Sequence, residues 1–252
     1  MEKIVCVAGP TASGKTRLAV ELAKAYDGEV LSCDSMQIYR GMAIGTAAPT
    51  LEEMQHMIGV ADPSEDFSVG KYVELAEPVL QDILSRGKTC VVCGGTGLYA
   101  DSLLLGRSFA PCPSTGMRET LEAEARQSGI EPLLARLKEV DPEAGARLHP
   151  SDKRRIIRAL EVYLETGETI SEHNRKTKLL PPKHEAVWIG LSFENRQDLY
   201  DRIDLRVERM LQDGLLDEIR ALLASGISPA ATAMQAIGYK EYVDCLTAGG
   251  DV

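Results

Sequence analysis

Short apolar runs, each five residues long, recur along the chain and are typical of buried strands. The runs are Ile4–Ala8, Glu29–Cys33, Thr89–Cys93 and Val187–Leu191. Longer segments with apolar residues at helical spacing predict helices at Lys15–Tyr26, Val69–Ser85 and Leu199–Leu223. Strands that alternate with helices indicate a parallel sheet with helices on both faces, joined by right-handed crossovers. The pattern therefore predicts the α/β class.

The stretch from residue 111 to residue 182 has a different pattern. Prolines mark its ends, at Pro111 and Pro113 and again at Pro181 and Pro182. The periodicity between them is helical throughout, at Thr115–Gln127, Glu131–Val140 and Lys153–Thr166. We therefore expect residues 1–110 and 183–252 to form the α/β core and residues 111–182 to form a helical insertion.

A glycine-rich loop joins the first predicted strand to the first predicted helix. Its residues are Gly9, Pro10, Thr11, Ala12, Ser13, Gly14, Lys15 and Thr16. They match the P-loop pattern G-x-x-x-x-G-K-[ST], whose backbone N–H groups and helix N-terminus form an anion-binding nest. Lys15 would hold phosphate oxygens and the Thr16 hydroxyl would bind Mg²⁺. The loop predicts a P-loop NTPase-like core that binds a polyphosphate.

Polar residues also follow the second and third predicted strands. Asp34, Ser35, Met36 and Gln37 follow one, and the segment Gly94–Tyr99 follows the other. The carboxyl ends of parallel strands meet at one edge of a sheet, so we expect these residues to lie beside the P-loop. Asp34 could position Mg²⁺, act as a general base or cap a helix.

The net charge of −10 disfavours a nucleic-acid partner, but basic residues are concentrated in two short segments of the chain. Lys153, Arg154, Arg155 and Arg158 form one group, and Arg175, Lys176, Lys178 and Lys183 form the other. Each could be an ordinary solvated face. Together they indicate a local anion-binding surface.

Cysteine usage and hydropathy limit the remaining possibilities. The chain has six cysteines, and Cys90 and Cys93 have C-x-x-C spacing. Residues three apart on a strand point to opposite faces, so we expect buried free thiols rather than a metal or redox site. No apolar run approaches the length of a membrane span, and no signal-peptide pattern is present. We therefore expect a soluble, cytoplasmic protein. We also expect it to be a monomer.

Several longer segments carry a family resemblance. They read GPTASGKT, DSMQIYRGMAIGTAAPT, GGTGLYADSLL, LHPSDKRRIIRALEVYLETGETIS and AIGYKE, in this order. Together they resemble the bacterial tRNA dimethylallyltransferases, also called tRNA isopentenylpyrophosphate transferases, over nearly the whole chain. The P-loop alone is shared with many kinases, whereas the combination is specific.

The resemblance implies transfer of a dimethylallyl group from dimethylallyl diphosphate to the exocyclic amine of the adenine that lies 3′ of the anticodon in tRNA. It implies that the P-loop and Mg²⁺ hold the diphosphate and that Arg206 contacts it. It also implies that Asp34 is the general base and that Thr96 contacts the target nucleotide. The residues implied to contact tRNA are Asp34, Ser35, Met36, Gln37, Thr96, Arg118, Lys153, Arg154, Arg155, Ile156 and Ile157.

Two alternatives use the same motifs differently. A small-molecule or nucleotide kinase would place ATP on the P-loop and would carry lid arginines for the transferred phosphoryl group. An RNA-binding module would retain a vestigial P-loop, although Lys15, Thr16 and Asp34 are all intact. Arg206, together with Arg202, could also form only surface ion pairs with acidic neighbours on its helix.

Overall fold

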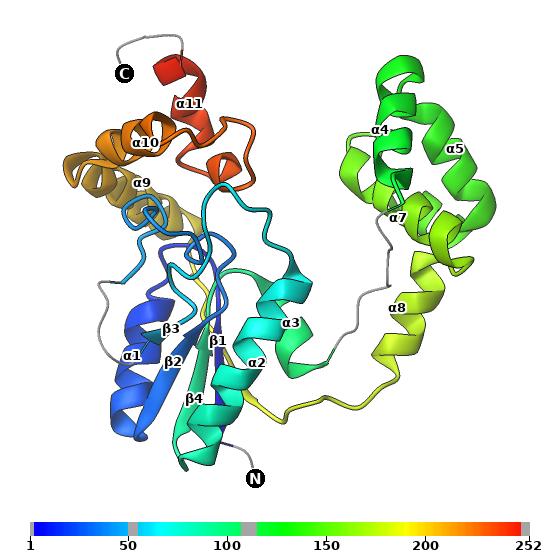
Figure 1. The fold of residues 1–252 in the computed structure, drawn as a ribbon. Coiled ribbons are helices and arrows are strands. Elements are labelled where there is room, and N and C mark those ends of the chain that lie inside the picture. The colour runs from blue at the N-terminus through cyan, green and yellow to red at the C-terminus, as the bar shows by residue number, and fades with distance from the viewer. Residues whose placement is uncertain (1–2, 50–54, 107–114, 248–252) are drawn as a thin grey trace. The chain divides into compact units, whose positions relative to one another are not determined.

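A parallel sheet forms the centre of the larger part of the molecule (Figure 1). The structure is a computed structural model, which describes residues 3–49, 55–106 and 115–247. The strands are β1 (Ile4–Ala8), β2 (Gly28–Ser32), β3 (Gln55–His56), β4 (Thr89–Cys93) and β5 (Val187–Gly190). Within the described residues they form one sheet of order β3-β2-β4-β1-β5, and every neighbouring pair is parallel. The α/β class with a parallel sheet is confirmed.

The chain divides into two compact units. Met1–Gly106 with Pro182–Val252 forms the core unit, and Arg107–Pro181 forms the helical unit. Pro111 and Pro113, which mark the expected start of the insertion, lie outside the described residues.

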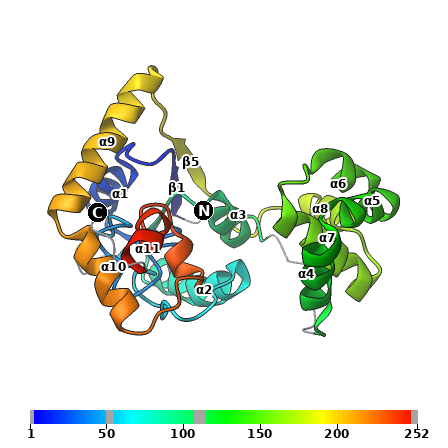
Figure 2. The same ribbon diagram turned by 90° about the horizontal axis from the view of Figure 1, so that it is seen from above.

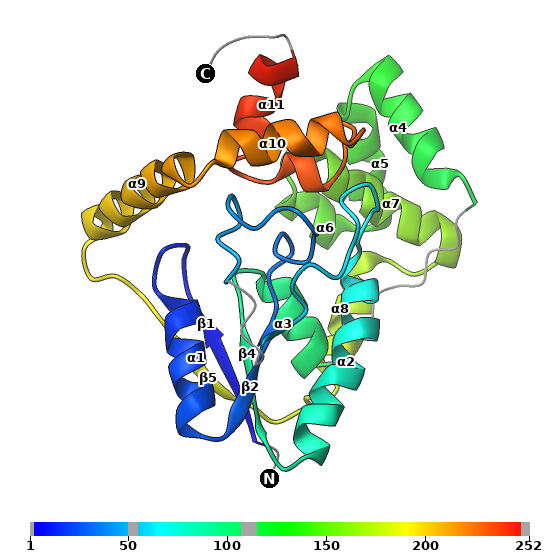
Figure 3. The ribbon, with the colours of Figure 1, turned by 60° about the vertical axis from the view of Figure 1, so that its left-hand side comes forward.

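Helices cover both faces of the sheet in the core unit (Figure 3). The helices of this unit are α1 (Lys15–Ala25), α2 (Val69–Ser85), α3 (Gly97–Leu104), α9 (Arg196–Gln212), α10 (Leu215–Ala224) and α11 (Lys240–Thr247). Helix α1 packs on β1, β2 and β4, while α2 packs on β2, β4 and α3. Helices α9, α10 and α11 follow one another beyond the carboxyl ends of the strands (Figures 1 and 2).

The central strand β4 shows how the sheet separates two hydrophobic clusters. All five residues of β4 are buried. Cys90 and Val92 belong to the cluster that includes α2, whereas Val91 and Cys93 belong to the cluster that includes α1. The two cysteines therefore face opposite sides of the sheet and form no disulfide. Burial raises the pKa of the Cys90 thiol to about 12 and that of Cys93 to about 11. The prediction of buried free thiols is confirmed.

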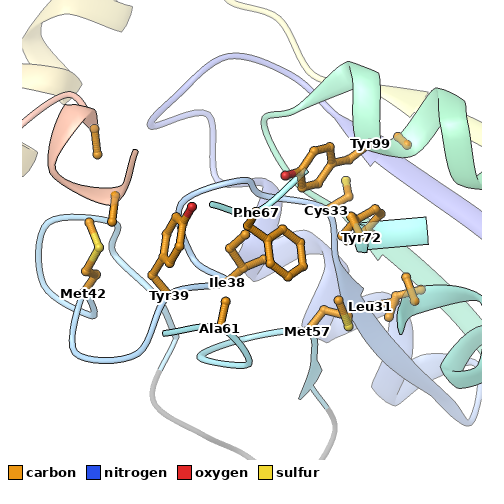
Figure 4. Packing of buried hydrophobic residues seen from close by; sticks show 14 of the residues in the cluster. Leu31, Cys33, Ile38, Tyr39, Met42, Met57, Ala61, Phe67, Tyr72 and Tyr99 are labelled. Carbon is orange, nitrogen blue, oxygen red and sulfur yellow. The ribbon is translucent and has the colours of Figure 1, made fainter. Parts of the chain in front are cut away.

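The larger cluster extends beyond the sheet into the segment that follows β2. Ile38, Tyr39 and Met42 of this segment are buried with residues of α2, α3, α10 and α11 (Figure 4). Tyr72 of α2 stacks on Tyr99 of α3 with ring centroids 4.3 Å apart. This packing joins the C-terminal helices to the loops that follow the strands.

The expectation of one helix over Leu199–Leu223 is wrong. The chain instead forms α9 and α10, which are separated at Gly214. Gly214 has φ 99°, a left-handed conformation that ends α9 and redirects the chain. Apolar spacing continues across the break, so periodicity alone did not reveal it.

The helical unit has its own hydrophobic core. Its helices are α4 (Met117–Ser128), α5 (Glu131–Val140), α6 (Pro142–Arg147), α7 (Lys153–Thr166) and α8 (Ile170–Lys178). Leu121, Leu133, Leu137 and Leu160 are fully or almost fully buried in this core. Asp141 is buried with them and accepts hydrogen bonds from the backbone N–H groups of Ala144 at 3.0 Å and Ser171 at 3.1 Å. One carboxylate thus joins the first turns of α6 and α8.

Candidate active site

The P-loop adopts the strand–loop–helix geometry that its sequence predicts. Gly9, Ala12 and Gly14 have φ values of 155°, 59° and 89°. A Cβ on Gly9 would lie 2.8 Å from the carbonyl oxygen of Leu191 and 3.2 Å from Ser13 Oγ, so a larger residue does not fit there. The loop therefore follows a path that depends on glycine, and it ends where α1 begins at Lys15.

Two side chains of the loop are suited to binding an anion. Lys15 Nζ donates a 2.7 Å hydrogen bond to the carbonyl of Pro10, which holds the ammonium group against the loop. Burial lowers the pKa of Lys15 from its ordinary value. Ser13 Oγ is buried and has no hydrogen-bond partner within the described residues. An unpaired buried hydroxyl is costly, and phosphate oxygens would satisfy it.

A cavity of about 770 Å³ lies between the P-loop and α9. The P-loop contributes residues 12–16, and the segment Ala43–Ala48 contributes a third wall. Arg202, Arg206 and Arg209 of α9 also line the cavity. Their i, i+4, i+7 spacing places them on one helix face. Arg209 was not among the predicted site residues, although its spacing from Arg202 and Arg206 is visible in the sequence.

Arg206 is the least exposed of these three arginines. It is half-buried, and its Nη2 donates a 3.3 Å hydrogen bond to the carbonyl of Thr46. Burial lowers the pKa of Arg206, and the negative charge of Asp34 opposes this effect. Asp34 acts on Lys15 in the same direction. The charge of Asp34 thus favours the protonated form of both Lys15 and Arg206. Within the described residues, Arg206 forms no ion pair with a neighbour on α9.

Asp34 shapes the loop after β2 with one oxygen. Its Oδ1 accepts hydrogen bonds from the backbone N–H groups of Met36 at 2.9 Å and Gln37 at 3.4 Å. No α-helix begins there, so the carboxylate stabilises a turn rather than a helix N-terminus. Asp34 Oδ2 takes part in none of the hydrogen bonds of the described residues. It lies 3.6 Å from where a Cβ on Gly95 would be. One carboxylate oxygen thus remains available for chemistry.

Thr96 connects the loop after β4 to the loop after β2. Its Oγ1 accepts a 3.0 Å hydrogen bond from the backbone N–H of Ser35 and donates to Ser35 Oγ at 3.1 Å. Gly94 permits this closeness, because a Cβ there would lie 2.5 Å from the carbonyl carbon of Cys33. The structure therefore brings Asp34, Ser35 and Thr96 together at the carboxyl ends of the paired strands β2 and β4, the edge of the sheet on which the sequence predicts them.

The donor groups of the cavity fit a magnesium ion that arrives with a polyphosphate. Thr16 lines the cavity beside Lys15. In the part of the chain that the structure describes, no three His, Cys, Asp or Glu side chains are grouped to hold a metal. Mg²⁺ is commonly bound by one or two protein groups, several waters and the phosphates of the substrate. The Thr16 hydroxyl together with phosphate oxygens would meet that requirement.

The residues predicted to contact tRNA from the helical unit have unequal surroundings. Arg118 forms a 2.8 Å ion pair with Glu161, which Arg158 also approaches at 2.9 Å. Ile156 and Ile157 are buried in the core of this unit. Their side chains therefore hold α7 in place within this unit, and the implied contact of these two residues with tRNA stays a prediction.

Three cations at the start of α7 are exposed. Lys153 and Arg154 take part in no ion pair among the described residues. Arg155 is 75% exposed and lies 3.6 Å from Asp152. The second basic group is more neutralised, because Arg175 pairs with Glu143 at 3.1 Å and Lys176 with Glu168 at 2.8 Å. The N-terminal turns of α7 thus carry the more accessible positive charge.

Known proteins resemble the chain over almost its entire length. A family model described as IPP transferase matches residues 37–251, and one described as isopentenyl transferase matches residues 2–60. A tRNA dimethylallyltransferase from Caldanaerobacter subterraneus subsp. tengcongensis is 46% identical over 97% of this chain and 79% of its own length. One from Geobacter sulfurreducens is 46% identical over 95% of this chain and 78% of its own length.

Solved structures of similar proteins extend the comparison to the fold. The full-length tRNA isopentenylpyrophosphate transferase of Bacillus halodurans superimposes with a TM-score of 0.69 and 41% identity, covering 100% of this chain and 80% of the other. A eukaryotic dimethylallyltransferase acting on tRNA gives a TM-score of 0.80 at 28% identity, covering 98% of this chain and 64% of the other. None of the helices in the described residues is long and apolar enough to span a membrane. The chain belongs to the tRNA dimethylallyltransferase, or IPP transferase, family.

Proposed function

We propose that this protein transfers the dimethylallyl group of dimethylallyl diphosphate to the exocyclic amine of the adenine 3′ of the anticodon in tRNA. The observation that carries the proposal is a cavity lined by the P-loop lysine Lys15 and by Arg206, which shares the Thr46 carbonyl with the residue that follows the Asp34 turn, Gln37. The family to which the chain belongs supports the same activity.

The diphosphate would lie on the P-loop. Its oxygens would accept hydrogen bonds from the loop amides and from Ser13 Oγ, which is otherwise unpaired. Lys15 and Arg206 would stabilise the negative charge that develops on the leaving diphosphate. A bound Mg²⁺, which the Thr16 hydroxyl would help to hold, would add further charge neutralisation at the same oxygens.

Asp34 would serve as the general base. As the bond between the allylic carbon and the diphosphate oxygen breaks, the diphosphate leaves with the bonding electrons and the adenine nitrogen forms the new bond to carbon. The proton that this nitrogen loses would pass to Asp34 Oδ2, the oxygen that is not used by the turn. Thr96 holds the neighbouring loop in register and would lie beside the target nucleotide.

The helical unit would bind the tRNA. Lys153, Arg154 and Arg155 offer exposed cations at the start of α7, and Arg118 adds one beside Glu161. Phosphate contacts of this kind hold RNA without reading its sequence. The target base must leave its stack to reach the cavity, as it does in enzymes that act on single bases.

One experiment separates the transferase from the kinase. The protein is incubated with Mg²⁺, unmodified tRNA and dimethylallyl diphosphate labelled in the allyl group, and in parallel with ATP labelled in the γ-phosphate. We expect the allyl label to appear on tRNA. Transfer of the ATP label to tRNA, a nucleotide or another small acceptor, with no allyl transfer, would show a kinase instead. The Asp34→Asn variant, which retains the P-loop, is the control for labelling that does not depend on the site.

A further inference from the structure

Glu218 of α10 binds the backbone of the segment that forms one wall of the cavity. Its Oε2 accepts a 2.9 Å hydrogen bond from the N–H of Ile44, and its Oε1 accepts a 3.1 Å bond from the N–H of Gly45. The two residues are 174 and 173 positions away in the sequence. Hydrogen bonds to a charged carboxylate are stronger than neutral ones, so this contact strongly restrains the segment.

Tyr239 contacts both Glu218 and the segment that Glu218 binds. It is fully buried, and its hydroxyl donates a 2.5 Å hydrogen bond to Glu218 Oε1. A Cβ on Gly45 would lie 2.3 Å from the Tyr239 ring, so the backbone approaches the ring as closely as only glycine permits. Burial, and then the hydrogen bond to Glu218, raise the pKa of Tyr239 well above its ordinary value, which keeps the hydroxyl a donor.

The restrained segment carries two contacts that reach the site. The carbonyl oxygen of Thr46 accepts hydrogen bonds from Arg206 Nη2 at 3.3 Å and from Gln37 Nε2 at 3.3 Å. The backbone N–H of Gln37 in turn donates to Asp34 Oδ1 at 3.4 Å. A single peptide carbonyl thus connects the guanidinium in the cavity with the turn that holds the carboxylate.

We propose that Glu218, assisted by Tyr239, is a positioning residue for the diphosphate-binding wall of the cavity. It holds Ile44 and Gly45 so that the Thr46 carbonyl fixes the orientation of Arg206. The inference rests on the function proposed above, since Arg206 would contact the diphosphate. Glu218 itself does not line the cavity. It acts through the backbone that it binds.

The test compares Glu218→Gln with a matched control, Asp217→Asn. Both residues lie in the first turn of α10, so both substitutions remove one negative charge near the same helix N-terminus. Asp217 is 82% exposed, and within the described residues its carboxylate pairs only with Arg220 on the surface. A glutamine amide offers one acceptor oxygen instead of two, so one of the amides of Ile44 and Gly45 loses its partner.

Two measurements report on positioning rather than on folding. We expect Glu218→Gln to raise the KM for dimethylallyl diphosphate by about 10-fold, because small misplacements of binding groups have effects of this size or larger. The KM for tRNA should change much less. The Kd for inorganic pyrophosphate, measured by calorimetry with Mg²⁺, should rise by a similar factor. Hydrogen exchange of the amides of Ile44 and Gly45 should become faster, and Asp217→Asn should show none of these changes.

The inference is overturned if Glu218→Gln and Asp217→Asn give the same donor KM and the same pyrophosphate Kd, even where Glu218→Gln lowers the melting temperature. Should Glu218→Gln fail to fold, Tyr239→Phe decides the question, since it removes only the hydroxyl. It should raise the donor KM and the pyrophosphate Kd in the same direction by a smaller factor, and unchanged values overturn the inference. A wild-type protein that transfers no allyl group would refute the proposed function, while pyrophosphate binding and amide exchange would still decide the role of Glu218.

Discussion

The hydroxyl of Thr96 and the backbone N–H of Ser35 form a 3.0 Å hydrogen bond between the loops that follow β4 and β2. The two residues are 61 positions apart in the sequence. Their contact fixes the distance between the loop that carries Asp34 and the loop that would meet the target nucleotide. Thr96 therefore has a measurable role even before its contact with substrate is considered.

Thr96→Val should separate that role from simple packing. Valine matches the shape of threonine but leaves the half-buried Ser35 N–H without its acceptor. We expect kcat/KM for tRNA to fall by about 10-fold or more, because the loop that carries Asp34 would shift from its productive position. Thr96→Ser retains the hydroxyl and should remain close to wild type. Equal activity of the valine and serine variants would contradict this role.

Asp34→Asn tests the proposed base. The asparagine side-chain oxygen can still accept the hydrogen bonds that Met36 and Gln37 donate, so the turn should persist. The group that takes the proton is removed, and we expect turnover to fall by about 10²-fold or more. Affinity for tRNA should change much less. A variant that keeps its turnover and loses only thermal stability would assign Asp34 to the turn alone.

The exposed cations of α7 should determine how salt affects tRNA binding. Replacing Arg154 and Arg155 with alanine should weaken binding and flatten the dependence of log affinity on log salt. The slope should decrease by somewhat under one unit for each phosphate that the variant no longer neutralises. Pyrophosphate binding at the P-loop should not change.

The matched control for this pair is Arg175→Ala with Lys176→Ala. It removes the same charge from the helical unit, but from side chains that already pair with Glu143 and Glu168. Salt titrations that give the same slope for both double variants would show that net charge, rather than the start of α7, attracts the tRNA. Circular dichroism would confirm that each variant is folded.

Glu29 should make the protein sensitive to acid. Its carboxylate is buried in β2, where it accepts hydrogen bonds from Arg86, from Lys88 Nζ at 2.8 Å and from His56 Nε2 at 2.7 Å. These contacts, that of Arg86 first, hold the pKa of Glu29 well below its ordinary value of 4.5 despite its burial. Because the pKa of Glu29 is lower in the folded than in the unfolded protein, its ionised carboxylate stabilises the fold at any pH above the unfolded-state pKa. This stabilisation is lost progressively as pH falls from the unfolded-state pKa through the folded-state pKa.

The test therefore measures the melting temperatures of wild type and Glu29→Gln at pH 7 and at a series of pH values from 5 downward. Glu29→Gln should lower the melting temperature at pH 7, and its difference from wild type should shrink progressively below pH 4.5, the ordinary value for this carboxyl. Asp82→Asn is the control, because Asp82 pairs with the same arginine but is 63% exposed. A difference between Glu29→Gln and wild type that stays constant with pH would contradict the prediction.

The local features of this protein follow from its sequence alone. The path of the P-loop depends on Gly9 and Gly14, which have positive φ angles. Glycine adopts such angles readily because it has no Cβ. Strands β1, β2, β4 and β5 and helices α1, α2, α4, α5 and α7 follow from the spacing of apolar residues, because a buried strand and an amphipathic helix impose different periods. The two-residue strand β3 is too short to give such a signal and was not predicted. Parallel strands also place their carboxyl ends at one edge of the sheet, so the sequence predicted that Asp34 and Thr96 share this edge.

Contacts between distant segments were decided only by the tertiary structure. The sequence shows neither that Glu218 binds the amides of Ile44 and Gly45 nor that Thr46 accepts a hydrogen bond from Arg206. It also placed Ile156 and Ile157 on the RNA-binding surface by family resemblance, whereas packing against α4 and α5 buries them. Such contacts depend on how whole helices pack, and that packing is set by the shapes of many side chains together rather than by any short pattern.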